Sequence, residues 1–132
     1  MSTNTPHDKV ECIMLVDDDP ASNYLARLLI EEIDDTIRVL TTRNGKDALD
    51  FLDGCLVSGN CPDLILLDLN MPGMDGFAFL ETLRSSRNPP RRIYILSSSQ
   101  YPPDIAKAAT FPTAGYLVKP ITLEQLQEII GS

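Results

Sequence analysis

The sequence predicts an α/β domain built on a parallel sheet of five strands. Five short apolar runs alternate along the chain with five stretches whose apolar residues recur at helical spacing. Strands that alternate with helices in this way are typical of βα units, with helices on both faces of the sheet. The chain has 132 residues, which is enough for one such domain with a hydrophobic core.

An apolar strand and an amphipathic helix open the domain. Residues 10–16 form a nearly continuous apolar run, which is typical of a strand buried on both faces. Asp19 and Pro20 then provide a helix N-cap and a first helical residue. We expect the inner face of this helix to carry four apolar residues: Leu25, Leu28, Leu29 and Ile33.

The second βα unit is marked by alternation and then by capping residues. Residues 36–41 alternate apolar and polar side chains and predict the second strand. Asn44 or Asp47 can cap the helix that follows. Residues 53–61 contain two glycines, and we expect them to form a loop.

Three further units fill the rest of the chain. We expect their strands at residues 64–67, 93–96 and 116–118. We expect their helices at residues 76–85, at residues 103–110, and from the capping pair Thr122 and Gln125 onward.

The composition excludes several classes of protein. A net charge of −8 argues against nucleic acid as the main partner. No apolar run approaches the roughly 20 residues that cross a bilayer. The polar residues 1–8 predict a flexible tail, which is followed by one domain over residues 9–132. Cys12, Cys55 and Cys61 lack metal-ligand spacing, so we expect free thiols in a reducing cytoplasm.

Polar residues follow four strands of the predicted sheet. Right-handed crossovers bring the carboxyl ends of parallel strands to one edge, where ligands bind in open α/β sheets. These ends carry Asp17 and Asp18, Asp68, Ser97 and Lys119. Each residue alone is explained as a helix cap, a turn residue or a surface charge, but their shared edge favours a common site.

The chemistry of this set points to phosphoryl transfer. Three crowded carboxylates repel one another unless a cation neutralises them, and oxygen ligands without imidazole or thiolate suit Mg²⁺. A carboxylate beside Mg²⁺ can attack phosphorus and form an acyl phosphate. Lys119 and Ser97 offer an ammonium and a hydroxyl to the phosphate oxygens. The sequence therefore predicts phosphoryl acceptance on an aspartate.

Four stretches of the chain resemble the receiver domain of two-component response regulators, and single-domain chemotaxis-type regulators in particular. They are residues 13–19, 64–76, 93–98 and 115–120. Their order and separations fit, and the resemblance covers roughly residues 9–131. It implies a flavodoxin-like, doubly wound (βα)5 fold with strand order 2-1-3-4-5.

The resemblance also implies roles for the acidic residues and their neighbours. Asp68 matches the phosphoacceptor of the family. Asp17 and Asp18 match the acid pair that holds Mg²⁺, with Asp18 as the more direct ligand. Asn70 matches the position that ligates the metal through its backbone carbonyl.

A second group of residues matches the switch of the family. Ser97 matches the hydroxyl that turns toward the phosphoryl group, and Tyr116 matches the aromatic residue that moves between outward and inward rotamers. Lys119 matches the invariant lysine, and the Lys119–Pro120 bond is usually cis in these domains. The fourth helix is flanked by Pro102-Pro103 and by Phe111-Pro112, which depart from the family pattern.

The resemblance implies a stand-alone, cytoplasmic signalling domain that is not an enzyme. It would take a phosphoryl group from a sensor histidine kinase or histidine phosphotransfer protein and then bind a downstream protein, as a monomer or weak dimer. It would not bind nucleic acid directly or a membrane.

Three alternatives remain open. The first is a receiver-like scaffold that is not phosphorylated. The second is a Mg²⁺-dependent aspartyl-phosphate phosphohydrolase. Such an enzyme would have an Asp-x-Asp motif on its first strand and would also carry a cap domain. The third is a flavodoxin-like cofactor binder, whose phosphate loop after the first strand would not carry the charge of Asp17, Asp18 and Asp19.

Overall fold

One parallel sheet organises the computed structural model, which describes residues 10–69, 76–84, 92–98, 102–111, 113 and 115–131. The strands are β1 (Cys12–Val16), β2 (Arg38–Thr42), β3 (Leu64–Leu67), β4 (Arg92–Ser97) and β5 (Gly115–Val118). They pair in the order β2-β1-β3-β4-β5, as predicted. The tail predicted over residues 1–8 lies outside the described residues.

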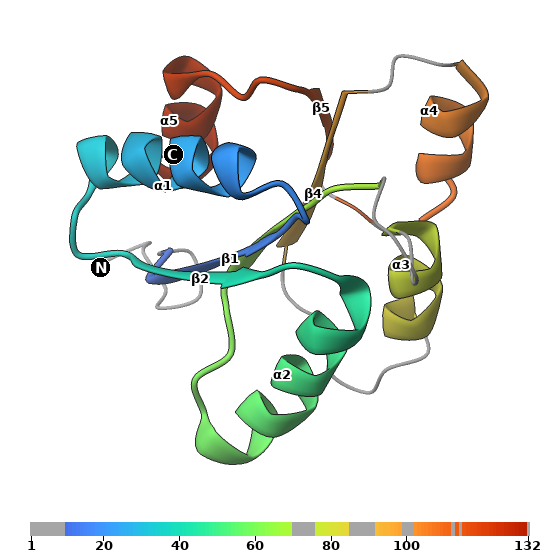
Figure 1. Cartoon of the computed structure of the whole chain (residues 1–132), viewed down its shortest axis with the longest axis horizontal. Helices are drawn as coiled ribbons and strands as arrows, with labels where there is room; N and C mark the ends of the chain where they lie inside the picture. Colours follow the sequence, from blue (N-terminus) through green and yellow to red (C-terminus); the bar gives the residue numbers. More distant parts are fainter. Residues whose placement is uncertain are drawn as a thin grey trace, which may run out of the picture.

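Helices cover both faces of the sheet. They are α1 (Pro20–Ile33), α2 (Gly45–Ser58), α3 (Gly76–Arg84), α4 (Pro102–Ala108) and α5 (Leu123–Gly131). Figure 1 shows α1 and α5 together on one face, and α2 and α3 on the other. None of the helices in the described part of the chain combines the length and the hydropathy of a membrane span.

The central strands supply both halves of the hydrophobic core. Met14 and Val16 of β1 belong to the cluster beneath α2 and α3, whereas Ile13 and Leu15 belong to the cluster beneath α1 and α5. Successive side chains of a strand point to opposite faces, so a strand between two helical layers must be apolar throughout. The residues after such a strand are therefore the first that can be polar.

Three helices start at capping residues that were predicted for them, and one of them is α2, whose N-cap is Asn44. Asp19 caps α1 by accepting a hydrogen bond from the backbone N–H of Ala21 at 3.0 Å. Thr122 and Gln125 form the reciprocal capping box of α5, with bonds of 3.0 and 3.1 Å. The Lys119–Pro120 bond is cis, as the resemblance implied.

The predicted inner face of α1 is partly wrong. Leu25 and Leu28 are 42% and 43% exposed, whereas Ala26 and Ile30 are buried. The helix carries two overlapping apolar stripes, and the stripe with the small Ala26 faces the sheet. An alanine allows the helix to approach the strands closely, although it contributes little to a hydropathy pattern.

The helix α2 is longer than predicted, and the expected loop over residues 53–61 is wrong in its first part. The helix continues to Ser58 and ends at Gly59, which adopts a left-handed conformation with φ of 79°. Glycine is favoured at this position because it lacks the Cβ that makes left-handed backbone costly. The chain then turns back toward β3.

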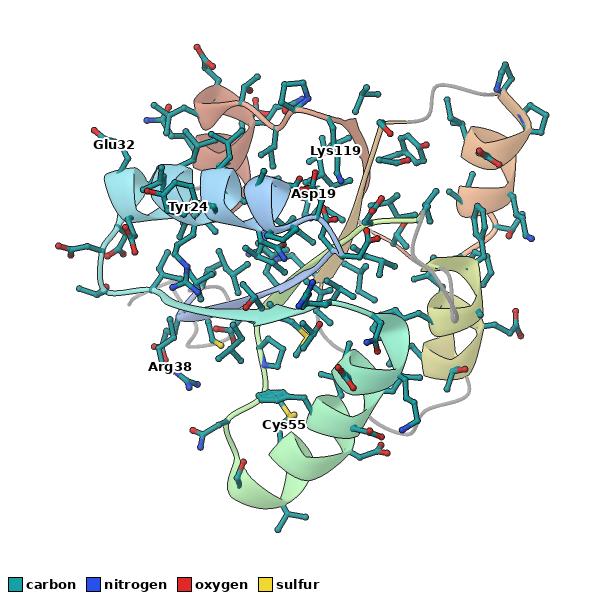
Figure 2. The ribbon with its side chains drawn as sticks, in the orientation of Figure 1. Asp19, Tyr24, Glu32, Arg38, Cys55 and Lys119 are labelled. Atoms are coloured by element: carbon teal, nitrogen blue, oxygen red, sulfur yellow. A yellow bond between two sulfur atoms is a disulfide. The ribbon has the colours of Figure 1, made fainter. Side chains whose placement is uncertain are left out.

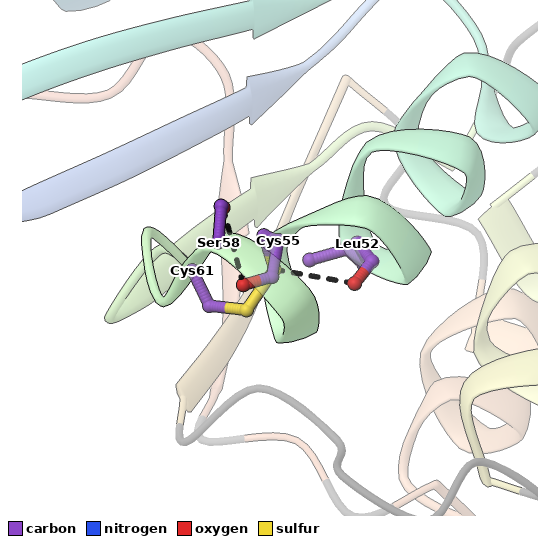
Figure 3. The surroundings of a disulfide bond; sticks show 4 residues. All are labelled: Leu52, Cys55, Ser58 and Cys61. Carbon is purple, nitrogen blue, oxygen red and sulfur yellow. Dashed lines mark hydrogen bonds between the residues drawn. A yellow bond between two sulfur atoms is a disulfide. The ribbon is translucent and has the colours of Figure 1, made fainter.

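This turn creates a disulfide that the sequence did not predict. Cys55 and Cys61 are bonded, with their Cα atoms 4.9 Å apart (Figure 3). Cys12 is buried and remains a free thiol. The expectation of three free thiols is therefore wrong for two of them, because the left-handed turn at Gly59 returns the chain beside the end of α2.

Gly76 is expected to be intolerant of any side chain. A Cβ at this position would lie 2.6 Å from the Cα of Leu69 and 2.8 Å from the carbonyl oxygen of Asp68. Both are backbone atoms and cannot move aside independently. We expect Gly76→Ala to lower the free energy of unfolding in urea by about 1–3 kcal/mol.

Gly54→Ala is the matched control for this variant, because the new methyl group meets nothing within 4 Å. In the interior of α2 the substitution should stabilise the domain by about 0.5–1 kcal/mol. Equal effects of the two variants would show that the close backbone approach at Gly76 carries no energetic cost.

Candidate acidic site

Main-chain hydrogen bonds place the residues that follow the strands side by side. The N–H of Asp68 donates to the carbonyl of Val16 at 2.9 Å, one residue beyond the end of β3. The N–H of Lys119 donates to the carbonyl of Ser97 at 2.8 Å, beyond the end of β5. The ladder thus continues past the strand ends and brings the predicted residues to one edge of the sheet.

Three carboxylates meet at this edge. One oxygen from each of Asp17, Asp18 and Asp68 lies within 4.8 Å of the other two. Asp17 and Asp68 are buried, and Asp18 is half-buried. A compact set of carboxylate oxygens fits a hard divalent cation such as Mg²⁺ better than a soft metal. The donor set therefore fits the metal that the sequence predicted.

Lys119 neutralises part of this charge. Its Nζ lies 2.7 Å from Oδ2 of Asp17 and 3.6 Å from Oδ2 of Asp68, and its side chain is only 18% exposed. Burial alone would lower the pKa of Lys119, but its hydrogen bond to Asp17 and the charges of Asp68 and Asp17 outweigh burial and raise that pKa above its ordinary value. The stability that the charged form of Lys119 gives to the folded domain is therefore fully present at neutral pH. It is lost only as the pH rises through the raised pKa of Lys119.

Hydrogen bonds from the start of α1 hold the acidic turn. The N–H of Asp19 donates to Oδ1 of Asp17 at 2.9 Å, and Nδ2 of Asn23 donates to the carbonyl oxygen of Asp17 at 2.9 Å. The positioning role of Asn23 was not predicted from the sequence. The available signal was a polar amide in the first turn of a helix that directly follows the acids.

Ser97 and Tyr116 lie on the same face of neighbouring strands. In the register of β4 and β5, Ser97 lies opposite Val118, and Ile95 lies opposite Tyr116. Tyr116 is therefore two residues before Val118, and the two side chains point to the same face as that of Ser97. Ser97 is fully buried, and Tyr116 is half-buried against the cluster beneath α2 and α3. The two predicted switch residues are thus brought together, whereas Asn70 lies outside the described residues.

Comparison with protein families identifies the domain. A family model described as the response regulator receiver domain matches residues 13–131. The chain belongs to this family. Receiver domains of response regulators act in two-component signalling, so the predicted resemblance is confirmed.

Individual relatives agree with this assignment. The receiver domain is 36% identical over 114 residues to the nitrate/nitrite response regulator protein NarL of Escherichia coli (strain K12), covering 86% of this chain and 50% of the relative. It is 32% identical over 120 residues to the positive alginate biosynthesis regulatory protein of Pseudomonas aeruginosa, covering 89% of this chain and 45% of the relative. The chain thus spans about half the length of these curated relatives.

A solved structure confirms the fold. The receiver domain resembles a two component response regulator from Cytophaga hutchinsonii, with a TM-score of 0.84 and 27% sequence identity. The match covers 93% of this chain and 96% of that one. The predicted doubly wound arrangement of five strands is therefore shared with a known receiver along nearly its whole length.

Removing the amine of Lys119 should destabilise the receiver domain. In Lys119→Met, two buried carboxylates lose their shared cation, and we expect the free energy of unfolding at pH 7 to fall by about 2 kcal/mol. Added Mg²⁺ should recover more stability in this variant than in wild type, because the variant has less compensating charge.

Lys46→Met is the matched control, because its ion pair with Asp50 is 3.5 Å long and the two side chains are 78% and 66% exposed. It should change stability by less than about 0.5 kcal/mol. A similar loss in both variants would show that the buried pairs carry no special weight.

Proposed function

We propose that this receiver domain accepts a phosphoryl group on Asp68 in a Mg²⁺-dependent reaction and thereby changes its binding to other proteins. The observation that supports this most directly is the position of Asp68. Its carboxylate lies in a cluster with those of Asp17 and Asp18, and the Nζ of Lys119 is 3.6 Å away. This combines a nucleophile, a cation site and a positive charge within one small volume.

The residues divide the work of the transfer between them. Asp17, Asp18, Asp68 and the backbone carbonyl of Asn70 would hold Mg²⁺. The metal would shield the approach of two anions and stabilise charge on the moving phosphoryl group. An oxygen of Asp68 attacks phosphorus, and the bond from phosphorus to the imidazole nitrogen of a donor phosphohistidine breaks.

Lys119 and Ser97 then receive the product. The ammonium of Lys119, held close to Asp68 at 3.6 Å, turns toward a phosphoryl oxygen. The hydroxyl of Ser97 turns toward another. The phosphoryl group adds close to two negative charges at neutral pH, so both contacts become stronger than those in the unmodified domain.

The switch follows from the shared face of Ser97 and Tyr116. When Ser97 moves toward the phosphoryl group, it leaves space that the ring of Tyr116 can enter. A local charge then becomes a changed surface around β5 and α4. We infer that the donor is a sensor histidine kinase or a histidine phosphotransfer protein. We also infer that the output is contact with a downstream protein, because a net charge of −8 disfavours direct nucleic-acid binding.

Asp68 should be the only acceptor of a small phosphodonor. With acetyl phosphate and Mg²⁺, intact mass should show the gain of one phosphoryl group in wild type and none in Asp68→Asn. Asp50→Asn removes an exposed carboxylate from α2 and should be modified normally. Chelation of Mg²⁺ should abolish the gain.

Two results would contradict this proposal. Modification that persists in Asp68→Asn would place the acceptor elsewhere. A folded domain that binds Mg²⁺ but is never modified would favour the unphosphorylated scaffold.

Tyr116 should carry the response without affecting the chemistry. We expect Tyr116→Ala to gain one phosphoryl group normally, because its ring takes no part in the transfer. Beryllofluoride, a phosphoryl mimic, should shift the backbone amide resonances of β5 and α4 less in this variant than in wild type. Leu28→Ala, which truncates an exposed side chain on α1, should respond as wild type does. Loss of phosphorylation in Tyr116→Ala, or an undiminished response, would count against the switch.

A further inference from the structure

A pocket of about 290 Å³ lies beside α1, at the edge of the sheet formed by β2. It is lined by Pro20, Asn23, Tyr24, Arg27, Thr41 and Arg43. Figure 1 shows α1 running alongside β2, and Figure 2 labels Tyr24 on α1. None of the three clustered carboxylates lines this pocket, so it is a separate feature of the domain.

Two arginines line the pocket, Arg27 and Arg43. Within the described ranges, neither arginine takes part in an ion pair, unlike Lys46 and Lys119. The chain holds 19 acidic and only 11 basic residues, so two such arginines in one pocket are unexpected. Guanidinium groups bind phosphate and carboxylate oxygens in paired hydrogen bonds. The charge of the pocket therefore suits an oxyanion.

The other walls of the pocket suit a flat, apolar group. Tyr24 is 63% exposed, so much of this aromatic residue is accessible to a ligand, and an aromatic ring can stack on a planar group. Pro20 adds apolar surface, and the hydroxyl of Thr41 can bond a polar edge of a ligand. Asn23 is already held by its bond to Asp17, so this wall is fixed before any ligand arrives. The volume is near the lower end for small-molecule sites, which begin at about 300 Å³.

We propose that this pocket binds a small organic phosphate that carries a planar ring. The phosphate pairs with Arg27 and Arg43, and the ring stacks on Tyr24. A nucleoside monophosphate has this chemistry and this size. The proposal is independent of phosphoryl acceptance on Asp68, because it uses different residues and forms no covalent bond.

Calorimetric titration with three related probes tests the assignment. AMP carries both the ring and the phosphate, adenosine lacks the phosphate, and ribose 5-phosphate lacks the ring. A chelator should be present throughout, so that no metal bridges the phosphate to the acidic site. We expect saturable binding of AMP and at least about tenfold weaker binding of adenosine, because a lost charge-assisted pair costs a factor of this order.

Variants separate the contributions of the pocket residues. Arg27→Gln and Arg43→Gln should each weaken AMP binding about tenfold or more. Tyr24→Ala should weaken AMP binding but leave the affinity for ribose 5-phosphate unchanged. Arg38→Gln is the matched control, because it removes the same charge from the first residue of β2, outside the pocket, and should bind AMP as wild type does (Figure 2).

Four results would overturn the proposal. They are the absence of saturable AMP binding at millimolar concentration, equal affinities for AMP and adenosine, an equal loss in Arg38→Gln, and a loss in Lys119→Met that the arginine variants do not show. The third would indicate a diffuse charge effect, and the fourth would place the phosphate at the acidic site. Every pocket variant should still be phosphorylated by acetyl phosphate, so failure of this proposal is distinguishable from failure of the proposed function.

Discussion

Three carboxylates held together at one edge of a sheet require a nearby positive charge, and the rest of the site depends on this requirement. In water such groups would separate, but the backbone bonds of Asp17 and Asp68 fix them beside each other. Removing one partner of a largely buried ion pair leaves the other charge without compensation in a poorly solvated place. Lys119 meets the requirement from β5 by contacting Asp17 and Asp68 at once. The end of β5 is therefore bound electrostatically to the ends of β1 and β3.

This arrangement links the acidic site to parts of the domain that lie far from it. A ligand that changes the charge around Asp68 changes the balance of forces on Lys119, which is part of the same chain segment as β5. Tyr116 lies on that strand, packed against the cluster beneath α2 and α3. On the other side, Asn23 joins the carbonyl of Asp17 to the first turn of α1 and also lines the arginine pocket. The acidic turn is thus connected to β5 on one side and to α1 and the arginine pocket on the other.

Much of the fold and the site could be predicted from the sequence because their signals are local. An apolar run that ends in an acid marks both a buried strand and its carboxyl end, as at Asp68. The features that failed depend on tertiary contacts. Leu25 and Leu28 have the hydropathy of core residues, yet the sheet covers the neighbouring stripe of α1. The pairing of Lys119 with Asp17 also could not be predicted, because it joins residues that follow two strands far apart in the sequence. The disulfide depends on a left-handed turn at Gly59 that no spacing rule revealed.

The disulfide also raises the question of whether the acidic site depends on the redox state of the chain. Cys61 lies before the amino end of β3, whereas Asp68 follows its carboxyl end. The start of β3 has a second anchor, since the carboxylate of Asp63 accepts hydrogen bonds from the N–H groups of Glu11 and Cys12 at 2.7 and 3.1 Å. The strand itself is paired on both sides, with β1 and β4. Reduction would therefore free the end of α2 while β3 stays in register, and the position of Asp68 is set by the sheet and not by the disulfide.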